Sequence, residues 1–180
     1  MLCLVSKGRS ADIALKNSDM SAEIKRVGRL LAGLLFGLVL VACSQEYGLD
    51  QHGRSIPAKA LDGKWLVINY WAQWCAPCRT EIPELNSLDQ QSEGRQFAVL
   101  GVNFDGLQGT KLEEASAEMG VAFRVLANDP AERFGLPRAE VLPVTYIVDA
   151  DGHIRDRLVG EQTAAGLSAR LSELMGGSKQ

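Results

Sequence analysis

Two closely spaced cysteines are the residues of this sequence best suited to chemistry. Cys75 and Cys78 stand in the run Trp74-Cys75-Ala76-Pro77-Cys78, directly after an apolar stretch and at the start of a predicted helix. A thiolate is the attacking species in disulfide exchange, and a free cysteine, with a pKa of about 8.5, is mostly protonated at neutral pH. At a helix N-terminus Cys75 would face unpaired backbone N–H groups, which favour the anion.

The spacing predicts different tasks for the two thiols. Cys78 lies one helical turn after Cys75 on the same face, so it can attack a mixed disulfide on Cys75 and release the substrate. Pro77 removes a backbone N–H and stiffens the turn between the cysteines. We therefore predict a redox site in which Cys75 and Cys78 react, with Trp74, Ala76 and Pro77 beside the substrate.

Two other interpretations of this cysteine pair stay open. A zinc site would need two further ligands, and the two histidines, His52 and His153, each stand alone in the sequence. A purely structural disulfide suits an oxidising compartment, but a bridge that closes so short a loop constrains the unfolded chain little. Redox catalysis is the favoured interpretation, and we predict no metal ion and no bound cofactor.

The N-terminal part of the chain has the layout of an export signal. Basic residues between Lys25 and Arg29 precede an apolar run from Leu30 to Val41. That run of about a dozen residues is shorter than the ~20 needed to cross a bilayer as a helix. A basic stretch, a short apolar stretch and a small residue are typical of export signals. We therefore predict a signal at residues 1–42, with Met20 as a possible true start; a transmembrane anchor is an alternative.

The predicted signal ends in Leu40-Val41-Ala42-Cys43, which resembles the lipobox of bacterial lipoproteins. A diacylglycerol on the Cys43 thiol and a further acyl chain would give lasting membrane attachment, where one chain alone is marginal. Ser44 follows, instead of the aspartate associated with retention in the inner membrane, which favours the outer membrane. If the signal is an ordinary cleaved one, Cys43 has no such role.

Length and charge limit the broad class of protein. The chain has 180 residues, with 19 lysines and arginines against 22 aspartates and glutamates and a formal net charge of −3. This length suits one domain with a hydrophobic core, and the lack of a basic block argues against nucleic acid as a partner. Four cysteines are too few to staple a small secreted domain. We expect the domain at residues 63–177, after a linker or short hairpin at 43–62.

Apolar runs and helical spacing predict the elements that position the cysteines. Strands are expected at 65–71, 97–104, 121–126, 144–148 and 153–159. Helices are expected from residue 75 onward with a kink at Pro83, at 111–119, as a turn at 131–134, and near the C-terminus over 164–174. Asp149, Asp151 and His153 are expected at an exposed turn without a metal. This alternation predicts an α/β fold with a central mixed sheet covered on both faces.

The stretch from Val67 to Pro83 resembles the thioredoxin superfamily, and most closely its TlpA/ResA/CcmG-like branch of exported reductases. The resemblance extends more loosely over residues 63–174. It implies a thioredoxin fold with a short N-terminal extension, a nucleophilic Cys75 and a resolving Cys78.

The resemblance also concerns the segment before the strand at 144–148. Pro143 matches the family's cis-proline, which would leave the Leu142 backbone free to pair with an extended substrate. An ordinary trans proline before a strand is the alternative. Residues 136–142 make the preceding loop longer than is usual in the family, and this loop would border the substrate groove.

Glu81 is the third predicted catalytic residue. Where thioredoxin has a buried aspartate that moves protons for the second cysteine, this sequence has Asn69. The branch it resembles commonly has asparagine there and a glutamate just after the second cysteine, which Glu81 matches. On the same helix face as Cys78, a partly buried Glu81 would have a raised pKa and could take the Cys78 proton. The alternative is a solvated acid favoured by the helix dipole.

These predictions together describe a monomeric, lipid-tethered reductase of disulfides in exported proteins, on the periplasmic side of a bacterial membrane. The resemblance implies a DsbD/CcdA-like electron donor, and substrates such as apocytochrome c or proteins with a copper site. An oxidase or isomerase would use the same residues at a higher potential. A lipoprotein that binds Cu(I) through both thiolates is a further alternative, although no methionine or histidine stands near the motif.

Overall fold

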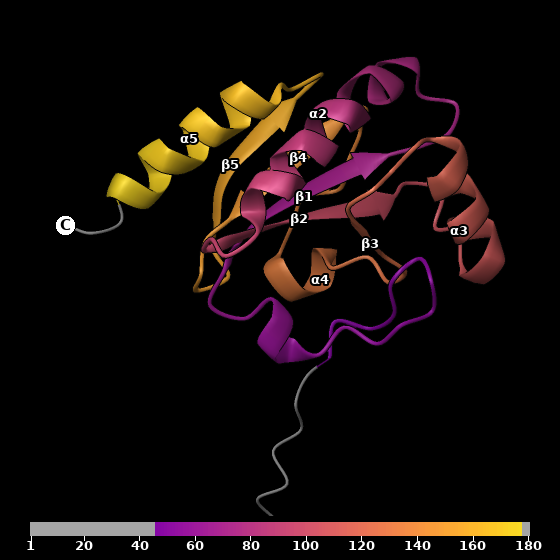
Figure 1. Cartoon of the computed structure of the whole chain (residues 1–180), viewed down its shortest axis with the longest axis horizontal. Helices are drawn as coiled ribbons and strands as arrows, with labels where there is room; N and C mark the ends of the chain where they lie inside the picture. The colour runs from indigo at the N-terminus through magenta and orange to yellow at the C-terminus, as the bar shows by residue number, and fades with distance from the viewer. Residues whose placement is uncertain (1–45, 178–180) are drawn as a thin grey trace, which may run out of the picture. The chain divides into compact units, whose positions relative to one another are not determined.

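A five-stranded sheet lies at the centre of the computed structural model, which describes residues 46–177 (Figure 1). The elements, in chain order, are η2 (Ala58–Ala60), β1 (Trp65–Trp71), α2 (Ala76–Ser92), β2 (Phe97–Asn103), α3 (Gly109–Glu118), β3 (Arg124–Leu126), α4 (Ala131–Phe134), β4 (Val144–Val148), β5 (Ile154–Val159) and α5 (Ala164–Gly177). The predicted export signal, the possible start at Met20 and the lipidation residue Cys43 lie outside the described residues.

The sheet is mixed, as the sequence predicts. Its strand order is β3-β2-β1-β4-β5. β1 pairs in parallel with β2, and β2 in parallel with β3, whereas β4 is antiparallel to both β1 and β5. The central position of β1 explains why its sequence is apolar at every position but Asn69, because a strand with neighbours on both sides and cover on both faces has no solvent-facing residues.

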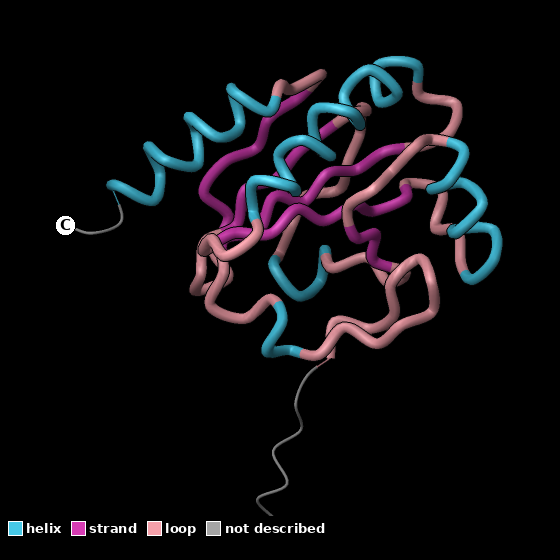
Figure 2. The backbone as a smooth tube through the Cα atoms, viewed as in Figure 1, coloured by secondary structure: helices cyan, strands magenta, loops and turns pink. Residues whose placement is uncertain are grey.

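Alternate residues of β1 enter two separate cores. Val67 and Trp71 point to the core that α2, α3 and α5 complete. Leu66 and Ile68 point to the opposite core, beneath α4, the loop after it and the segment 47–61. Helices and loops thus cover both faces of the sheet (Figure 2). This packing confirms the predicted α/β arrangement and holds β1 rigidly, so that the turn leading from it to the cysteines has a fixed base.

Several predicted boundaries were wrong, including the ends of the strand expected at 97–104, which stops at Asn103, and of the helix expected over 164–174, which continues to Gly177. The strand expected at 121–126 covers only Arg124–Leu126, because the Ala122 N–H is bonded to the Asn86 side chain instead of the sheet. The helix expected at 111–119 spans Gly109–Glu118. The strand expected from His153 begins at Ile154, because the His153 N–H closes the preceding turn on the Asp149 carboxylate, 2.9 Å away.

The segment 46–62 folds against the domain. Leu49 and Ser55 form an antiparallel bridge, and Asp50 bridges to Leu126 of β3. Within this segment Tyr47, Ile56 and Leu61 are buried against the sheet. Because the segment pairs with β3, it covers an edge that would otherwise present free backbone groups. Between residues 46 and 177, no helix combines the length and the apolar character needed to cross a membrane.

Candidate active site

Cys75 and Cys78 form a disulfide at the N-terminus of α2, with their Cα atoms 5.3 Å apart. Cys75 is the N-cap residue, and its Sγ accepts a hydrogen bond of 3.2 Å from the Cys78 N–H. Cys75 keeps 3% of its surface accessible to solvent, and Cys78 keeps none. Cys75 is therefore the more accessible residue of the pair, and the backbone donor beside its sulfur would stabilise a thiolate there.

The turn before the cysteines is tied to α3. The Cys75 N–H donates to the Ala72 carbonyl at 3.1 Å, which closes the turn after β1. Arg79 donates to the Gln73 carbonyl at 2.8 Å and pairs with Glu118 at 3.4 Å, and Gln73 itself donates to Glu118 at 2.7 Å. These groups are exposed, so their contribution to stability is small. They nevertheless join three segments around the motif.

Trp74 is the most exposed aromatic residue of the site, with 65% of its surface accessible. Its indole Nε1 donates to both carboxylate oxygens of Asp105, at 3.1 and 3.2 Å. The Phe104 ring meets the indole edge to face at 6.0 Å between centroids. Trp74 is therefore a fixed apolar surface beside Cys75. The sequence did not predict a role for Asp105, because an acidic residue in a loop 31 residues away carries no local signal of this contact.

The other two aromatic residues of this region belong to the core. Trp71 is fully buried, and Tyr70 is nearly so. The Tyr70 hydroxyl donates to Asp129 at 2.6 Å, and burial is the main cause that raises the pKa of this phenol above its usual value. Both residues therefore pack mainly inside the domain. Ala76 is exposed and Pro77 half-buried at the start of α2.

The Leu142–Pro143 peptide bond is cis, as the family resemblance implied. Tyr70 and Val144 are partners in the β1–β4 ladder, so Pro143 lies at the end of the sheet where the chain leaves β1 for the cysteines. The Pro143 carbonyl accepts a hydrogen bond of 2.9 Å from the Gly160 N–H. The register thus brings the two distant motifs, Cys75–Cys78 and Leu142–Pro143, to the same end of the sheet.

The long loop before Pro143 is anchored to the sheet. Leu136 and Ala139 are buried in the core beneath it, and the Tyr146 hydroxyl donates to the Pro137 carbonyl at 2.7 Å. Val141 is exposed. Together with Phe104, the loop lines a pocket of about 260 Å³. The residues of this loop therefore shape a pocket beside Phe104, the residue whose ring contacts Trp74.

Glu81 is almost completely buried, with 1% of its surface accessible, so the alternative of a solvated surface acid does not hold. Its Oε2 accepts a hydrogen bond of 2.8 Å from Asn69 Nδ2, and its Oε1 one of 3.1 Å from the Gln162 N–H. Burial, opposed only in part by these donors, raises the pKa of Glu81 to about 7. A carboxyl group with this pKa can exchange a proton near neutral pH.

The close group of potential metal ligands lies outside the cysteine motif. In the described part of the chain, the one close group of such side chains is Asp149, Asp151 and His153, at the turn between β4 and β5. Asp149 already accepts from the Asp151 and His153 N–H groups and from Arg155. His52 instead contacts Glu113 at 2.9 Å. Among the described residues, no close group of potential metal ligands includes Cys75 or Cys78.

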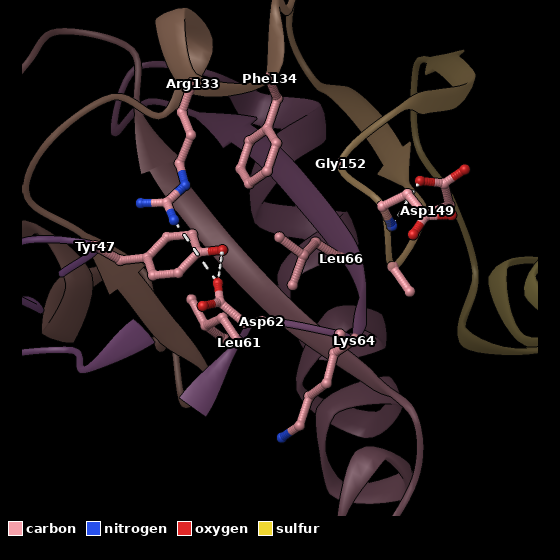
Figure 3. A pocket seen from close by; sticks show the side chains of 12 residues that line it. Tyr47, Leu61, Asp62, Lys64, Leu66, Arg133, Phe134, Asp149 and Gly152 are labelled. Carbon is pink, nitrogen blue, oxygen red and sulfur yellow. Dashed lines mark hydrogen bonds and ion pairs between the residues drawn. The ribbon is translucent and has the colours of Figure 1, made fainter. Parts of the chain in front are cut away.

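A larger pocket, of about 340 Å³, lies at the other end of β1 (Figure 3). The Arg133 guanidinium stacks 3.8 Å above the Tyr47 ring, and the Tyr47 hydroxyl donates to Asp62 at 2.9 Å. Burial, and then the bond to Asp62, raise the pKa of Tyr47 to about 12. Leu66 near the start of β1 lines this pocket, whereas the cysteines follow the end of that strand. The two sites are therefore separate.

Comparison with known proteins identifies the family. The model of the AhpC/TSA family matches residues 41–157, well over half of the chain. The chain belongs to this family. Within it the chain is one of the thiol–disulfide oxidoreductases of the TlpA/ResA/CcmG-like branch, in keeping with its Cys75–Cys78 disulfide.

Two relatives and one solved structure illustrate this membership. Thiol:disulfide interchange protein HelX of Rhodobacter capsulatus is 35% identical over 126 residues, which are 67% of this chain and 66% of HelX. Thiol–disulfide oxidoreductase ResA of Bacillus thuringiensis is 26% identical over 125 residues, 69% of this chain and 72% of ResA. A thioredoxin family protein of Chlorobium tepidum, described as a thiol:disulfide interchange protein, superposes with a TM-score of 0.60 at 23% identity, over 71% of this chain and 90% of its own. This superposition confirms the predicted thioredoxin fold.

Proposed function

We propose that this oxidoreductase works as a reductase of disulfides in exported proteins. In its reduced form, the Cys75 thiolate attacks a substrate disulfide, forming a mixed disulfide and releasing one substrate thiolate, which takes up a proton. Cys78 then attacks the Cys75 sulfur, releases the second substrate thiolate and closes the Cys75–Cys78 disulfide. Two electrons pass to the substrate, and no bound cofactor is required.

The observation that carries this proposal is the disulfide at the N-terminus of α2 with a buried carboxyl group on the same helix face. Cys75 is the more accessible residue of the pair, which suits it to the first attack. Cys78 must lose its proton before it attacks in turn. Glu81, whose pKa is raised to about 7 by burial, can accept that proton at neutral pH.

Substrate contact is proposed at the end of the sheet that carries both the Cys75–Cys78 motif and the Leu142–Pro143 motif. The exposed ring of Trp74 and the surface of Ala76 and Pro77 would contact the side chains next to the substrate cysteine. The Leu142 backbone, before Pro143, would pair with the extended substrate chain as an added strand. In this proposal both contacts would orient the substrate disulfide for attack by Cys75.

The cellular setting follows from the N-terminal sequence. We propose that residues 1–42 direct export, that Cys43 carries the lipid anchor, and that the domain at 63–177 works on the periplasmic side, at the outer membrane. The segment 43–62 would connect anchor and domain. A reductase there must be re-reduced, and a DsbD/CcdA-like dithiol donor supplies the two electrons. Apocytochrome c and copper-site proteins are the proposed substrates of the monomer.

The reduction potential of the purified protein tests the direction of the reaction. We expect equilibration with glutathione or dithiothreitol buffers to give a value near or below about −220 mV, as for reductive members of the superfamily. A value near about −120 mV would make the protein an oxidant and overturn the reductase proposal. Both results would keep Cys75 and Cys78 as the reacting pair.

A further inference from the structure

Two neutral polar residues surround the Glu81 carboxyl group. Asn69 of β1 and Thr145 of β4 are direct partners in the antiparallel ladder, and both are fully buried. Asn69 Nδ2 donates to Glu81 Oε2 at 2.8 Å and to Thr145 Oγ1 at 2.9 Å. The Thr145 hydroxyl lowers the pKa of Glu81, against the larger effect of burial. The three side chains form a connected polar cluster inside an apolar core.

This cluster is not what packing alone would select. Asn69 Oδ1 is buried and has no hydrogen-bond partner. Leaving an acceptor unsatisfied in the interior costs free energy, which an apolar side chain at this position of β1 would avoid. The side-chain amide of Asn69 is oriented so that Nδ2 donates to both Glu81 Oε2 and Thr145 Oγ1. The amide is therefore explained by Glu81 and not by the stability of the strand.

We infer that Asn69 and Thr145 are positioning residues that hold the Glu81 carboxyl group and allow it to change its charge inside the core. This inference rests on the proposed function, in which Glu81 takes the proton of Cys78. An asparagine cannot take up a proton itself, so in this chain the strand residue orients the proton acceptor, which stands on the helix. The ionised carboxylate receives Nδ2–H from Asn69 and O–H from Thr145.

The same two residues can also serve the protonated form. A protonated Glu81 needs an acceptor, and its third contact, the Gln162 N–H, can only donate. The Thr145 oxygen can accept the carboxyl hydrogen, and a half-turn of the Asn69 amide would present the unsatisfied Oδ1 to it. Hydroxyl and amide groups can both donate and accept, so the cluster can satisfy Glu81 in either state.

The remaining groups around Glu81 are few. The charge of Glu161, in the turn before α5, acts against ionisation of Glu81. On α2 itself stand Cys75, Cys78 and Glu84, and Glu84 is engaged with the Ala164 N–H at 2.8 Å. β1 and β4 contribute no charged side chain among the hydrogen-bond partners of Glu81, so the two neutral residues are the means by which the sheet influences its ionisation.

The test is a titration of the Glu81 carboxyl ¹³C resonance in the oxidised full-length protein, in which the disulfide prevents Cys75 and Cys78 from titrating. Thr145→Val has nearly the same shape but no hydroxyl, and we expect it to raise the Glu81 midpoint by about one pH unit, a tenfold change in proton affinity. Thr145→Ser keeps the hydroxyl and should leave the midpoint near that of the wild type. Asn69→Asp replaces the donor with an acid, and should raise the midpoint further through a shared proton.

The wild-type protein provides a test that needs no variant. The Asn69 side-chain ¹⁵N resonance should titrate with the midpoint of Glu81, because its hydrogen bond changes with the charge. A constant Asn69 resonance, or a folded Thr145→Val with an unmoved Glu81 midpoint, would overturn the inference. Failure of the proposed function looks different: Glu81→Gln would then leave the rate of mixed-disulfide resolution unchanged, whatever the titrations show.

Discussion

Replacing Glu81 with glutamine should make the protein more stable at neutral and alkaline pH. Glu81 is buried, and its pKa is raised from 4.5 to about 7 in the folded protein. In the unfolded chain the carboxyl group is hydrated and ionises at the lower value. Its ionisation above that value therefore favours unfolding, since only the unfolded state gives up the proton easily.

The sign and size of the effect follow from this difference. Below pH 4.5 Glu81 is protonated in both the folded and the unfolded state, so it does not change the free energy of unfolding. As the pH rises toward 7, the free energy of unfolding falls by 1.36 kcal/mol per pH unit because of this group. Above pH 7 Glu81 is ionised in both states, and the loss levels off at about 3 kcal/mol. Glutamine stays neutral, so Glu81→Gln avoids this loss.

Urea denaturation of the oxidised protein at pH 4 to 8.5 measures this prediction. The difference in unfolding free energy between Glu81→Gln and the wild type should grow by about 3 kcal/mol over that range, while other carboxyl groups cancel in the comparison. Free-thiol assays should verify that the Cys75–Cys78 disulfide is intact at every pH. A difference that does not vary with pH would show that Glu81 has an ordinary pKa, and the assignment of Glu81 as proton acceptor for Cys78 would fail with it.

Three other substitutions test the site and the core. Cys78→Ser should accumulate a mixed disulfide between Cys75 and the substrate protein, seen as a band shift on non-reducing gels and removed by dithiothreitol; trapping by Cys75→Ser instead would reverse the assigned roles. Gly101→Ala should lower the unfolding free energy by about 1–3 kcal/mol, because the new Cβ would lie 3.0 Å from two core side chains; an unchanged denaturation midpoint would contradict this. Glu161→Gln should lower the pKa of Glu81 by removing a neighbouring negative charge, and a ¹³C titration in which the Glu81 midpoint stays or rises would refute that effect.

The parts of the fold that depend on local sequence were predictable. β1 is apolar at nearly every position because both of its faces are covered, and its predicted bounds were correct. Cys75 precedes a helix whose first turn contains Pro77, a residue favoured there because its missing N–H is not needed. These features need only neighbours within a few residues, so a single sequence reveals them.

Some structural features that the sequence did not predict depend on contacts between distant segments. Residues 121–123 have the composition of a strand, but the Asn86 side chain of α2 bonds the Ala122 backbone before the strand begins. The polar segment 43–62 was predicted as a linker or a short hairpin, and its composition does not reveal that Tyr47 and Ile56 are buried in the core. In both cases a partner far away in the chain outweighs local preference, and composition carries no record of that partner.

The candidate site likewise combines features that local sequence predicts with features that depend on the tertiary structure. The residue types and spacing of Cys75 and Cys78 predict a redox pair, because a helix N-terminus and a one-turn separation suffice for that chemistry. The state of Glu81 is a tertiary property. Asn69 stands 12 residues before it and Gln162 stands 81 residues after it. Only the folding of β1 and the turn before α5 against α2 removes water from this carboxyl group and supplies its donors, and desolvation by distant segments is what shifts its pKa.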